Sequence, residues 1–309
     1  MMTDLTVKGA DGLAVHVYEW LPEKNVVGVV QIAHGMAEHG ARYDRFAKFL
    51  NQAGYAVYAN DHRGHGKSIP EGVLPGHMAD EGGWEKAVED LYLINDEISK
   101  RHPGQKITLV GHSMGSFMAQ DYMAKYGHTI HAIALSATNG PPGTLGKIAQ
   151  LATRVEKLRN GNEGHSSLLA NMSFKAFNKA FAPNRTEFDW LSRDNAEVDK
   201  YVEDPMCGFE CTVATWIGLI DAMARIAGDD ALSQMDKSKP IYVFSGTDDP
   251  VGEKTKGTDR LLKAYKKHKF ECVSHKYYEG GRHEILNETN NDTVMQDFLQ
   301  WLNGAQTTT

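Results

Sequence analysis

Short apolar runs rich in β-branched residues recur along this chain, and helical patterns separate most of them. The first strong run, residues 26–33 (VVGVVQIA), has the length and composition of a buried strand. This alternation predicts βαβ units and therefore a mostly parallel sheet flanked by helices. The other predicted strands are residues 55–60, 107–110, 131–136, 241–245 and 272–278, and the predicted helices are residues 42–53, 84–99, 113–126, 256–267 and 293–302.

The alternation stops after residue 138. Residues 139–230 contain helical patterns, such as the apolar face within residues 148–155, but no convincing central strand. The chain from Ser113 to the next strand is also much longer than the helix and loops of one βαβ unit require. We therefore expect a sheet domain formed by residues 1–138 and 231–309, with residues 139–230 inserted as a helical cap.

The ends of the chain carry weaker signals. Residues 5–7 and 15–20 look like a hairpin at the edge of the sheet. The start, MMTDLTVKGADG, lacks a basic segment followed by an apolar one, so no secretory signal is expected. The tail GAQTTT is expected to be frayed.

Charge and cysteine content limit the classes of function. The net charge of −7, from 33 basic and 40 acidic residues, gives no general attraction to nucleic acid or anionic lipid. The Lys-rich segment 254–269 is expected to be a solvated helix face rather than a nucleic-acid site. No apolar run approaches the roughly 18 residues of a membrane span. The three cysteines fit a reducing, cytoplasmic setting better than a disulfide framework. No feature predicts an oligomeric state.

The sequence Gly-His-Ser-Met-Gly at residues 111–115 lies between a predicted strand and a predicted helix. A serine on such a tight turn is held in a strained backbone conformation with its Oγ exposed, and glycine is needed two residues before and after it. The N-terminus of the following helix adds positive potential where an oxyanion would form. Ser113 is therefore a candidate nucleophile. The alternative is a serine that only caps the helix.

A nucleophilic serine on this type of turn predicts a histidine after the last strand. The run 272–278 is followed by Glu-Gly-Gly-Arg-His, which places His283 in a glycine-flanked loop that can reach Ser113. The other late histidines are weaker candidates, because His268 is expected in a solvated helix and His275 inside the last strand.

The same order predicts an acid after the preceding strand. The run 241–245 is followed by Gly-Thr-Asp-Asp-Pro, so Asp248 and Asp249 are both candidates. Adjacent side chains point in different directions, so only one of the two can hold the imidazole ring. The other is expected to cap the turn.

The loop that begins with His34 and Gly35 follows the first strong strand and is expected to supply an oxyanion-hole amide. Glycine at position 35 lets the backbone approach a substrate closely, and the natural donors are the amides of Met36 and Met114. The alternative is that Gly35 only forms a tight turn between strand and helix.

We expect no metal ion and no organic cofactor. Cys207 and Cys211 lack a second Cys/His pair at ligand spacing, which disfavours a zinc site. Four histidines near the predicted strand ends do not match a helix-borne ligand pattern, and loop packing is the expectation for them: His34, His39, His62 and His65.

With these residues in place, the sequence resembles the α/β-hydrolase superfamily, and within it the serine hydrolases of the monoacylglycerol lipase and lysophospholipase-like group. The resemblance covers about residues 10–303 and is weakest in the insertion. It is carried by HGMAEHGARYDRFA (34–47), DHRGHGKS (61–68), GHSMGS (111–116), EDPMC (203–207), GTDDP (246–250) and EGGRHEIL (279–286).

The resemblance implies an α/β-hydrolase fold and a role for each matching residue. Ser113 is implied as nucleophile, His283 as base and Asp249 as acid, because the family's acid stands three residues after the strand-end glycine. Met36 and Met114 are implied as oxyanion-hole amides, and Glu38 and Arg42 as residues that order the head-group end of the substrate. The family's first motif usually has glycine at the position of Ala37. Its inserted cap normally forms an apolar acyl tunnel.

These features predict a serine carboxylic ester hydrolase that acts on monoacylglycerol- or lysophospholipid-like esters through an acyl-enzyme intermediate. Its partner is expected to be a small amphipathic ester, with transient membrane-surface contact through the apolar face of the cap.

Other functions on the same fold stay open. A short- or medium-chain carboxylesterase, a thioesterase or a peptidase would keep the three catalytic residues and change the cap. A catalytically inactive, ligand-binding protein would be expected to have lost one of the three. Epoxide and haloalkane hydrolases need a carboxylate where this chain has Ser113.

Overall fold

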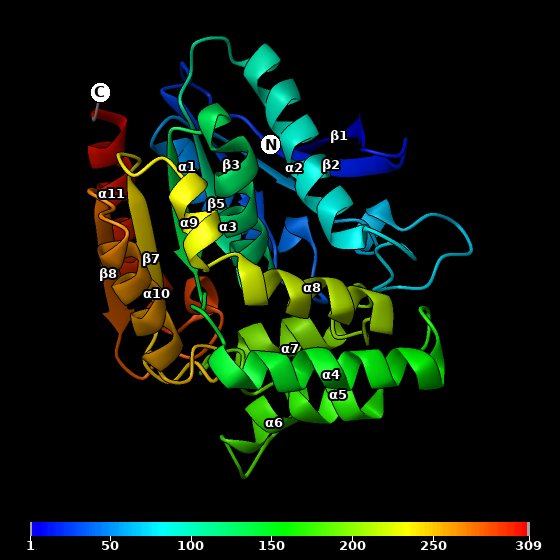
Figure 1. Cartoon of the computed structure of the whole chain (residues 1–309). Coiled ribbons are helices and arrows are strands. Elements are labelled where there is room, and N and C mark those ends of the chain that lie inside the picture. The colour runs from blue at the N-terminus through cyan, green and yellow to red at the C-terminus, as the bar shows by residue number, and fades with distance from the viewer. Residues whose placement is uncertain (1, 308–309) are drawn as a thin grey trace.

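The computed structural model describes residues 2–307 and contains one eight-stranded sheet with the order β1-β2-β4-β3-β5-β6-β7-β8 (Figure 1). The β1–β2 and β2–β4 pairs are antiparallel and the other pairs are parallel. The structure therefore confirms the mostly parallel sheet and the hairpin at its edge. The strands are β1 Met2–Lys8, β2 Ala14–Trp20, β3 Gly28–Ala33, β4 Tyr55–Asn60, β5 Ile107–His112, β6 Ala132–Ser136, β7 Ile241–Gly246 and β8 Val273–Tyr278.

Successive side chains of a strand point to opposite faces of the sheet, and each face has its own apolar core. On β3, Val29 packs with the core that includes helices α2, α3 and α10, whereas Val30 packs with the core that includes α1 and α11. The sheet is thus covered on both faces, as a parallel sheet requires. These helices are α1 Asp44–Gln52, α2 Gly83–Arg101, α3 Met114–Tyr126, α10 Lys256–Lys267 and α11 Asn291–Thr307, with short 3-10 helices η1 Gly40–Tyr43, η2 Gly66–Ser68, η3 Gly127–Thr129 and η4 Ile285–Asn287.

Between β6 and β7 the described chain forms helices and loops but no strand, and α4–α8 lie together below the sheet in Figure 1. This insertion contacts loops that follow strands: the Tyr201 hydroxyl donates to the Ala37 carbonyl at 2.8 Å, and the Glu284 N–H donates to the Leu191 carbonyl at 2.7 Å. We propose that residues 139–230 act as a cap over these loops. The inserted helices are α4 Gly143–Asn160, α5 Ser167–Met172, α6 Phe174–Lys179, α7 Asn195–Glu203, α8 Val213–Arg225 and α9 Asp229–Gln234.

The predicted frayed tail is wrong over its described part, because α11 continues to Thr307. Two side chains from elsewhere in the core hold this last turn. The Lys106 ammonium donates to the Gln306 carbonyl at 2.7 Å, and the His131 ring lies 2.8 Å from the Ala305 carbonyl. Tertiary contacts therefore extend a helix that its own polar sequence does not favour. The last two residues of the tail lie outside the described residues.

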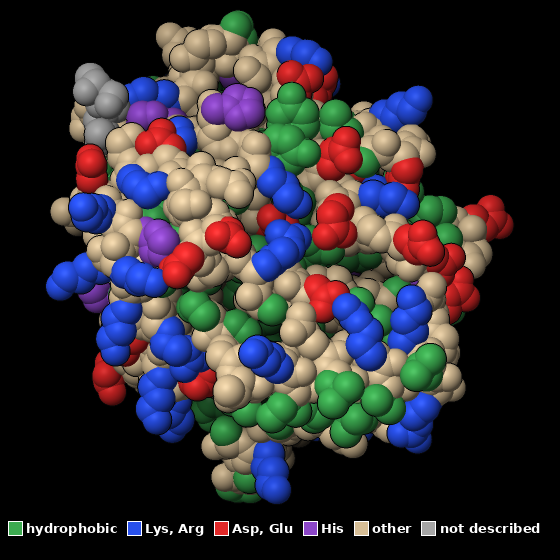
Figure 2. Space-filling view, viewed as in Figure 1, with side chains coloured by type: hydrophobic (Ala, Val, Ile, Leu, Met, Phe, Trp, Pro, Cys, Tyr) green, Lys and Arg blue, Asp and Glu red, His purple; other side chains and the backbone are tan. Residues whose placement is uncertain are grey.

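Helix α4 turns an apolar face to solvent. Leu145 is 68% exposed and Leu158 is 89% exposed, and Ile148, Leu151 and Val155 are exposed between them. Figure 2 shows hydrophobic side chains gathered over this part of the molecule, with Lys and Arg side chains beside them. Within residues 2–307, no helix has both the length and the apolarity needed to cross a membrane.

Candidate active site

Ser113 occupies the turn between β5 and α3, and its backbone is strained. Its φ and ψ angles are 50° and −119°, a region that residues other than glycine rarely adopt. The Ser113 N–H donates to the Ser136 carbonyl at 3.0 Å, which ties the turn to the end of β6. The structure thus has the strained turn that the sequence predicts, at a helix N-terminus where negative charge is stabilised.

Gly111 and Gly115 flank Ser113 in spaces that hold no side chain. A Cβ atom at Gly111 would overlap the backbone of Gly115, and a Cβ atom at Gly115 would overlap the carbonyl oxygens of Ala33 and His34. The tight turn therefore depends on glycine at both positions, as the sequence predicts.

We expect Gly115→Ala to lower the free energy of unfolding by about 2–3 kcal/mol, because the overlapping backbone can move only by distorting the end of β3. Gly127→Ala is the matched control, since a Cβ atom there meets only the Met123 side chain, at 3.7 Å. Urea denaturation of both variants measures the difference. Equal stability of the two variants would contradict the close approach at Gly115.

Asp249 and His283, on the loops after β7 and β8, form a buried pair. Asp249 Oδ1 lies 2.9 Å from His283 Nδ1 and accepts the Val251 N–H at 2.9 Å. Both side chains are buried. An acceptor at Nδ1 fixes the tautomer of the ring and leaves Nε2 free to act as a base.

Asp248, the alternative acid, does not contact His283. Its carboxylate is 45% exposed and lies 3.8 Å from the Lys254 ammonium, and its N–H donates to the Gly281 carbonyl at 2.9 Å. Of the two adjacent aspartates, the structure brings only Asp249 to the histidine.

Ser113 and His283 line one narrow cavity, whose free volume of about 20 Å³ has room for about one water molecule. Met36 also lines it, and Met114 begins α3 directly after Ser113 with its side chain buried. Met36 thus lies at the cavity and Met114 directly after Ser113, the two positions from which we expect the oxyanion-hole amides. The other lining residues are Gly35, Glu38, His112, Phe174, Trp190, Leu191, Tyr201 and Glu284.

His112 is a neutral neighbour of His283. The centroids of the two rings are 4.9 Å apart, and His112 Nδ1 lies 3.2 Å from the Ser136 hydroxyl. Burial, with a smaller contribution from His283, lowers the pKa of His112 to about 4. At neutral pH His112 therefore adds no positive charge that would oppose protonation of His283.

The loop after β3 is held by Glu38 and by the insertion. Glu38 Oε1 accepts the Gly35 N–H at 2.6 Å, and the Ala37 carbonyl accepts the Tyr201 hydroxyl and, at 3.0 Å, the Gly208 N–H. Ala37 has a φ angle of 55°, which glycine adopts more readily. These bonds hold the strained loop beside Ser113.

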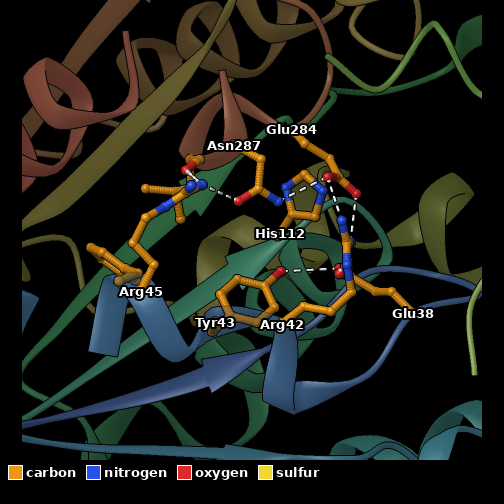
Figure 3. Close-up of a pocket in the computed structure, with 9 residues that line it drawn as sticks. Glu38, Arg42, Tyr43, Arg45, His112, Glu284 and Asn287 are labelled. Atoms are coloured by element: carbon orange, nitrogen blue, oxygen red, sulfur yellow. Dashed lines mark hydrogen bonds and ion pairs between the residues drawn. The ribbon is translucent and has the colours of Figure 1, made fainter. Parts of the chain in front are cut away.

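A buried ion cluster lies behind this loop (Figure 3). The Arg42 guanidinium donates to Glu38 Oε2 at 2.5 Å and forms two bonds to Glu284, at 2.6 and 2.7 Å. Tyr43 donates its hydroxyl proton to Glu38 and Asn287 donates its amide to Glu284. Burial opposes ionisation of Glu284, but Arg42 outweighs it, so the pKa of Glu284 lies well below its usual range.

The predicted substrate residues Glu38 and Arg42 are therefore neighbours in this cluster. Glu38 borders the Ser113 cavity, and both residues border a second small cavity of about 20 Å³, drawn in Figure 3. Sequence reasoning missed Glu284, although it borders both cavities. Its position directly after His283 was the signal that could have identified it.

Residues 24–290 match the serine aminopeptidase S33 family. The chain belongs to this family of α/β hydrolases. The match covers most of the sheet domain and the whole insertion. It agrees with the resemblance that the motifs indicate, and it confirms the predicted α/β-hydrolase fold.

Proteins similar to this chain include lipases and esterases. A monoacylglycerol lipase from Mycolicibacterium smegmatis is 29% identical, with 95% of this chain and 94% of that protein covered. A human monoglyceride lipase is 28% identical over 95% of this chain and 88% of that protein. The structure of a Bacillus coagulans carboxyl esterase in complex with glycerol has a TM-score of 0.90 at 26% identity, and 99% of each chain is covered. This chain is thus a monoacylglycerol lipase-like α/β hydrolase of the lipase/esterase type.

Among residues 2–307, two groups of side chains bring metal-ligating atoms within 4.8 Å of one another: His39, Asp204 and Cys207, and His77, Asp80 and Glu163. In the first group, His39 Nε2 lies 2.8 Å from Asp204 Oδ2. Burial raises the pKa of the Cys207 thiol, which disfavours the thiolate that a metal ion would bind.

Three of the four histidines that the sequence assigns to loop packing form close ring contacts: His34, His62 and His65. The centroids of His34 and His62 are 4.0 Å apart, and those of His34 and His65 are 5.3 Å apart. His34 Nε2 accepts the backbone N–H of His62 at 2.9 Å. Burial lowers the pKa of His62 to about 3, so its ring is neutral at physiological pH.

Proposed function

We propose that this hydrolase is a serine carboxylic ester hydrolase that cleaves monoacylglycerol- or lysophospholipid-like esters through an acyl-enzyme intermediate. The observation that carries the proposal is the strained Ser113 beside a buried Asp249–His283 pair, with the serine and the histidine lining one cavity. A strained serine without a base would support a capping role only.

In the proposed mechanism, His283 Nε2 takes the proton of Ser113 as Oγ attacks the ester carbonyl. Amides of Met36 and Met114 stabilise the oxyanion, an effect of about 3 kcal/mol per donor. His283 then gives the proton to the leaving alcohol, and water attacks the acyl-enzyme with His283 again as base. Asp249 holds the ring and stabilises its charged form throughout.

The lining of the cavity supports an amphipathic substrate. Phe174, Leu191 and Trp190 supply apolar surface, and Glu38 and Glu284 supply polar surface. These two kinds of lining match in polarity the acyl chain and the hydroxylated head group of such an ester. The names of the similar lipases, and the glycerol-bound esterase of the same fold, favour glycerol esters as the substrate class.

We propose that Glu38 and Arg42, bound to each other, form the polar side of the site that orders the head group of the substrate. The Arg42 guanidinium is bound by two carboxylates, so its own contact with a substrate is secondary to holding Glu38 and Glu284 in place. Glu38 in turn holds the loop that carries the Met36 amide, through the Gly35 N–H.

A hydrolysis panel tests the proposal. It compares monoglycerides, lysophospholipids, nitrophenyl esters of increasing chain length, a thioester and an aminoacyl amide, with Ser113→Ala as the blank. We expect the highest kcat/KM with a monoglyceride or a lysophospholipid. A preference for the thioester would favour a thioesterase, and a preference for the amide would favour an aminopeptidase.

The exposed face of α4 supports contact with a lipid surface, because an apolar helix face lowers its free energy by entering the headgroup region of a bilayer. We expect Leu145→Asp with Leu158→Asp to weaken co-sedimentation with phosphatidylcholine vesicles at least 10-fold, since each leucine contributes roughly 1.5–3 kcal/mol when buried. Val27→Asp, at an exposed apolar residue outside the insertion, is the control. Equal vesicle binding by all three proteins would rule out α4 as the contact.

A further inference from the structure

Trp190 carries a buried hydrogen-bond donor without a partner. The residue is 3% exposed, and its indole Nε1 forms no hydrogen bond within residues 2–307. A buried N–H that forms no bond costs free energy, and native proteins retain few such groups without a reason. A bound ligand that supplies an oxygen would remove this cost.

The unpaired donor belongs to a side chain of the candidate active site. Trp190 lines the cavity that contains Ser113 and His283, and its ring lies against the His283 ring with the centroids 4.8 Å apart. Its other neighbours include Phe174, whose ring stacks on it at 5.4 Å. Its backbone is also fixed, because its N–H donates to Asn178 Oδ1 at 3.1 Å. The indole is therefore held in place before any ligand binds.

The other polar side chains of this cavity, apart from Ser113 and His283, are already engaged. Glu38 and Glu284 bind Arg42, and the Tyr201 hydroxyl donates to Ala37. His112 lies at hydrogen-bond distance from Ser136. Among the side chains that line this cavity, Trp190 thus adds an indole N–H without a hydrogen-bond partner to the reacting groups of Ser113 and His283.

The position of Trp190 beside His283 indicates which part of a substrate it meets. In ester cleavage the histidine gives its proton to the leaving alcohol oxygen, so groups next to its ring lie on the alcohol side of the reacting carbon. We propose that Trp190 is a substrate-binding residue whose indole N–H donates to a free hydroxyl of the alcohol part of the ester. This assignment rests on the proposed function and deepens it. The hydrogen bond would favour esters of polyols, which keep a free hydroxyl, over esters of simple alkyl alcohols.

The test compares a monoglyceride with the methyl ester of the same fatty acid, which has no free hydroxyl. Trp190→Phe keeps an aromatic ring against His283 and removes the donor. We expect this variant to raise KM for the monoglyceride about 3- to 10-fold more than KM for the methyl ester, the effect of one lost hydrogen bond, with any effect of the altered ring packing on kcat common to both esters. Trp216→Phe is the matched control: it removes an indole that also packs near Phe174, and we expect no change with either ester.

Equal changes with the two esters, or no change with either, would overturn the assignment, because both results make Trp190 a packing residue. If Trp190→Phe does not fold, Trp190→His restores a ring N–H and should keep the monoglyceride preference; loss of that preference would also overturn it. The proposed function fails separately, when the unchanged protein hydrolyses neither ester above the Ser113→Ala blank.

Discussion

Asp249→Asn is expected to lower kcat for ester hydrolysis by about 10⁴-fold while the protein stays folded. Asp249 Oδ1 lies 2.9 Å from His283 Nδ1. An asparagine amide in its place donates to Nδ1, which forces the proton to Nε2 and leaves His283 unable to accept the Ser113 proton. It also removes the negative charge that stabilises the imidazolium. Steady-state hydrolysis of a nitrophenyl ester measures the loss.

The adjacent Asp248 provides the matched control. Its carboxylate is exposed beside Lys254 and does not approach His283, so Asp248→Asn should keep kcat within about 2-fold, in line with the small energies of exposed ion pairs. A 10⁴-fold loss in Asp248→Asn with an active Asp249→Asn would reverse the assignment of the acid. Circular dichroism spectra confirm that both variants are folded.

Arg42→Met is expected to lower the free energy of unfolding by about 3–5 kcal/mol, because it leaves the buried carboxylates of Glu38 and Glu284 without their cation. The Arg42 side chain is 11% exposed, against 4% for Glu38 and 7% for Glu284. Water therefore replaces little of the lost interaction. Urea denaturation at neutral pH measures the change.

Arg154→Met controls for the loss of an ion pair at the surface. Arg154 lies 2.6 Å from Asp221, but its side chain is 48% exposed, so we expect a cost below about 1 kcal/mol. Losses of equal size in the two variants would contradict the energetic importance of the buried cluster.

The effect of Arg42→Met should depend on pH with a defined sign. The pKa of Glu284 is lowered to about 2 in the folded protein, so the stability it contributes is fully present above its unfolded pKa of about 4.3 and is lost as the pH falls from there through about 2. The difference between the unchanged protein and Arg42→Met should therefore shrink on acidification. A difference that stays constant from about pH 5 to about pH 2 would show that Glu284 does not carry the effect.

The sequence predicted the sheet and the placement of the strongest site residues because both depend on local patterns. Short runs of alternating or continuous apolar residues predict strands. The carboxyl ends of parallel strands then lie at one edge of the sheet. Ser113, Asp249 and His283 each follow such a strand, so their approach follows from strand order. The choice between Asp248 and Asp249 required either the family resemblance or the side-chain directions.

The remaining features depend on contacts between distant segments, which no local pattern encodes. Arg42 and Glu284 pair across 242 positions of the chain. Trp190 lies in a segment without helical or strand periodicity, and the sequence does not indicate that its donor stays unpaired. The spacing of apolar residues predicts an apolar face on α4. Whether another element covers that face depends on the tertiary fold, and here it is exposed.

The central claim is that Ser113 is a nucleophile activated by His283 and Asp249, and labelling with a fluorophosphonate followed by peptide mass spectrometry tests it most directly. We expect the folded protein to carry one label, on Ser113, with Ser113→Ala unlabelled and Asp249→Asn labelled far more slowly. Absence of label from the folded protein, or undiminished labelling of Ser113→Ala, would contradict the claim.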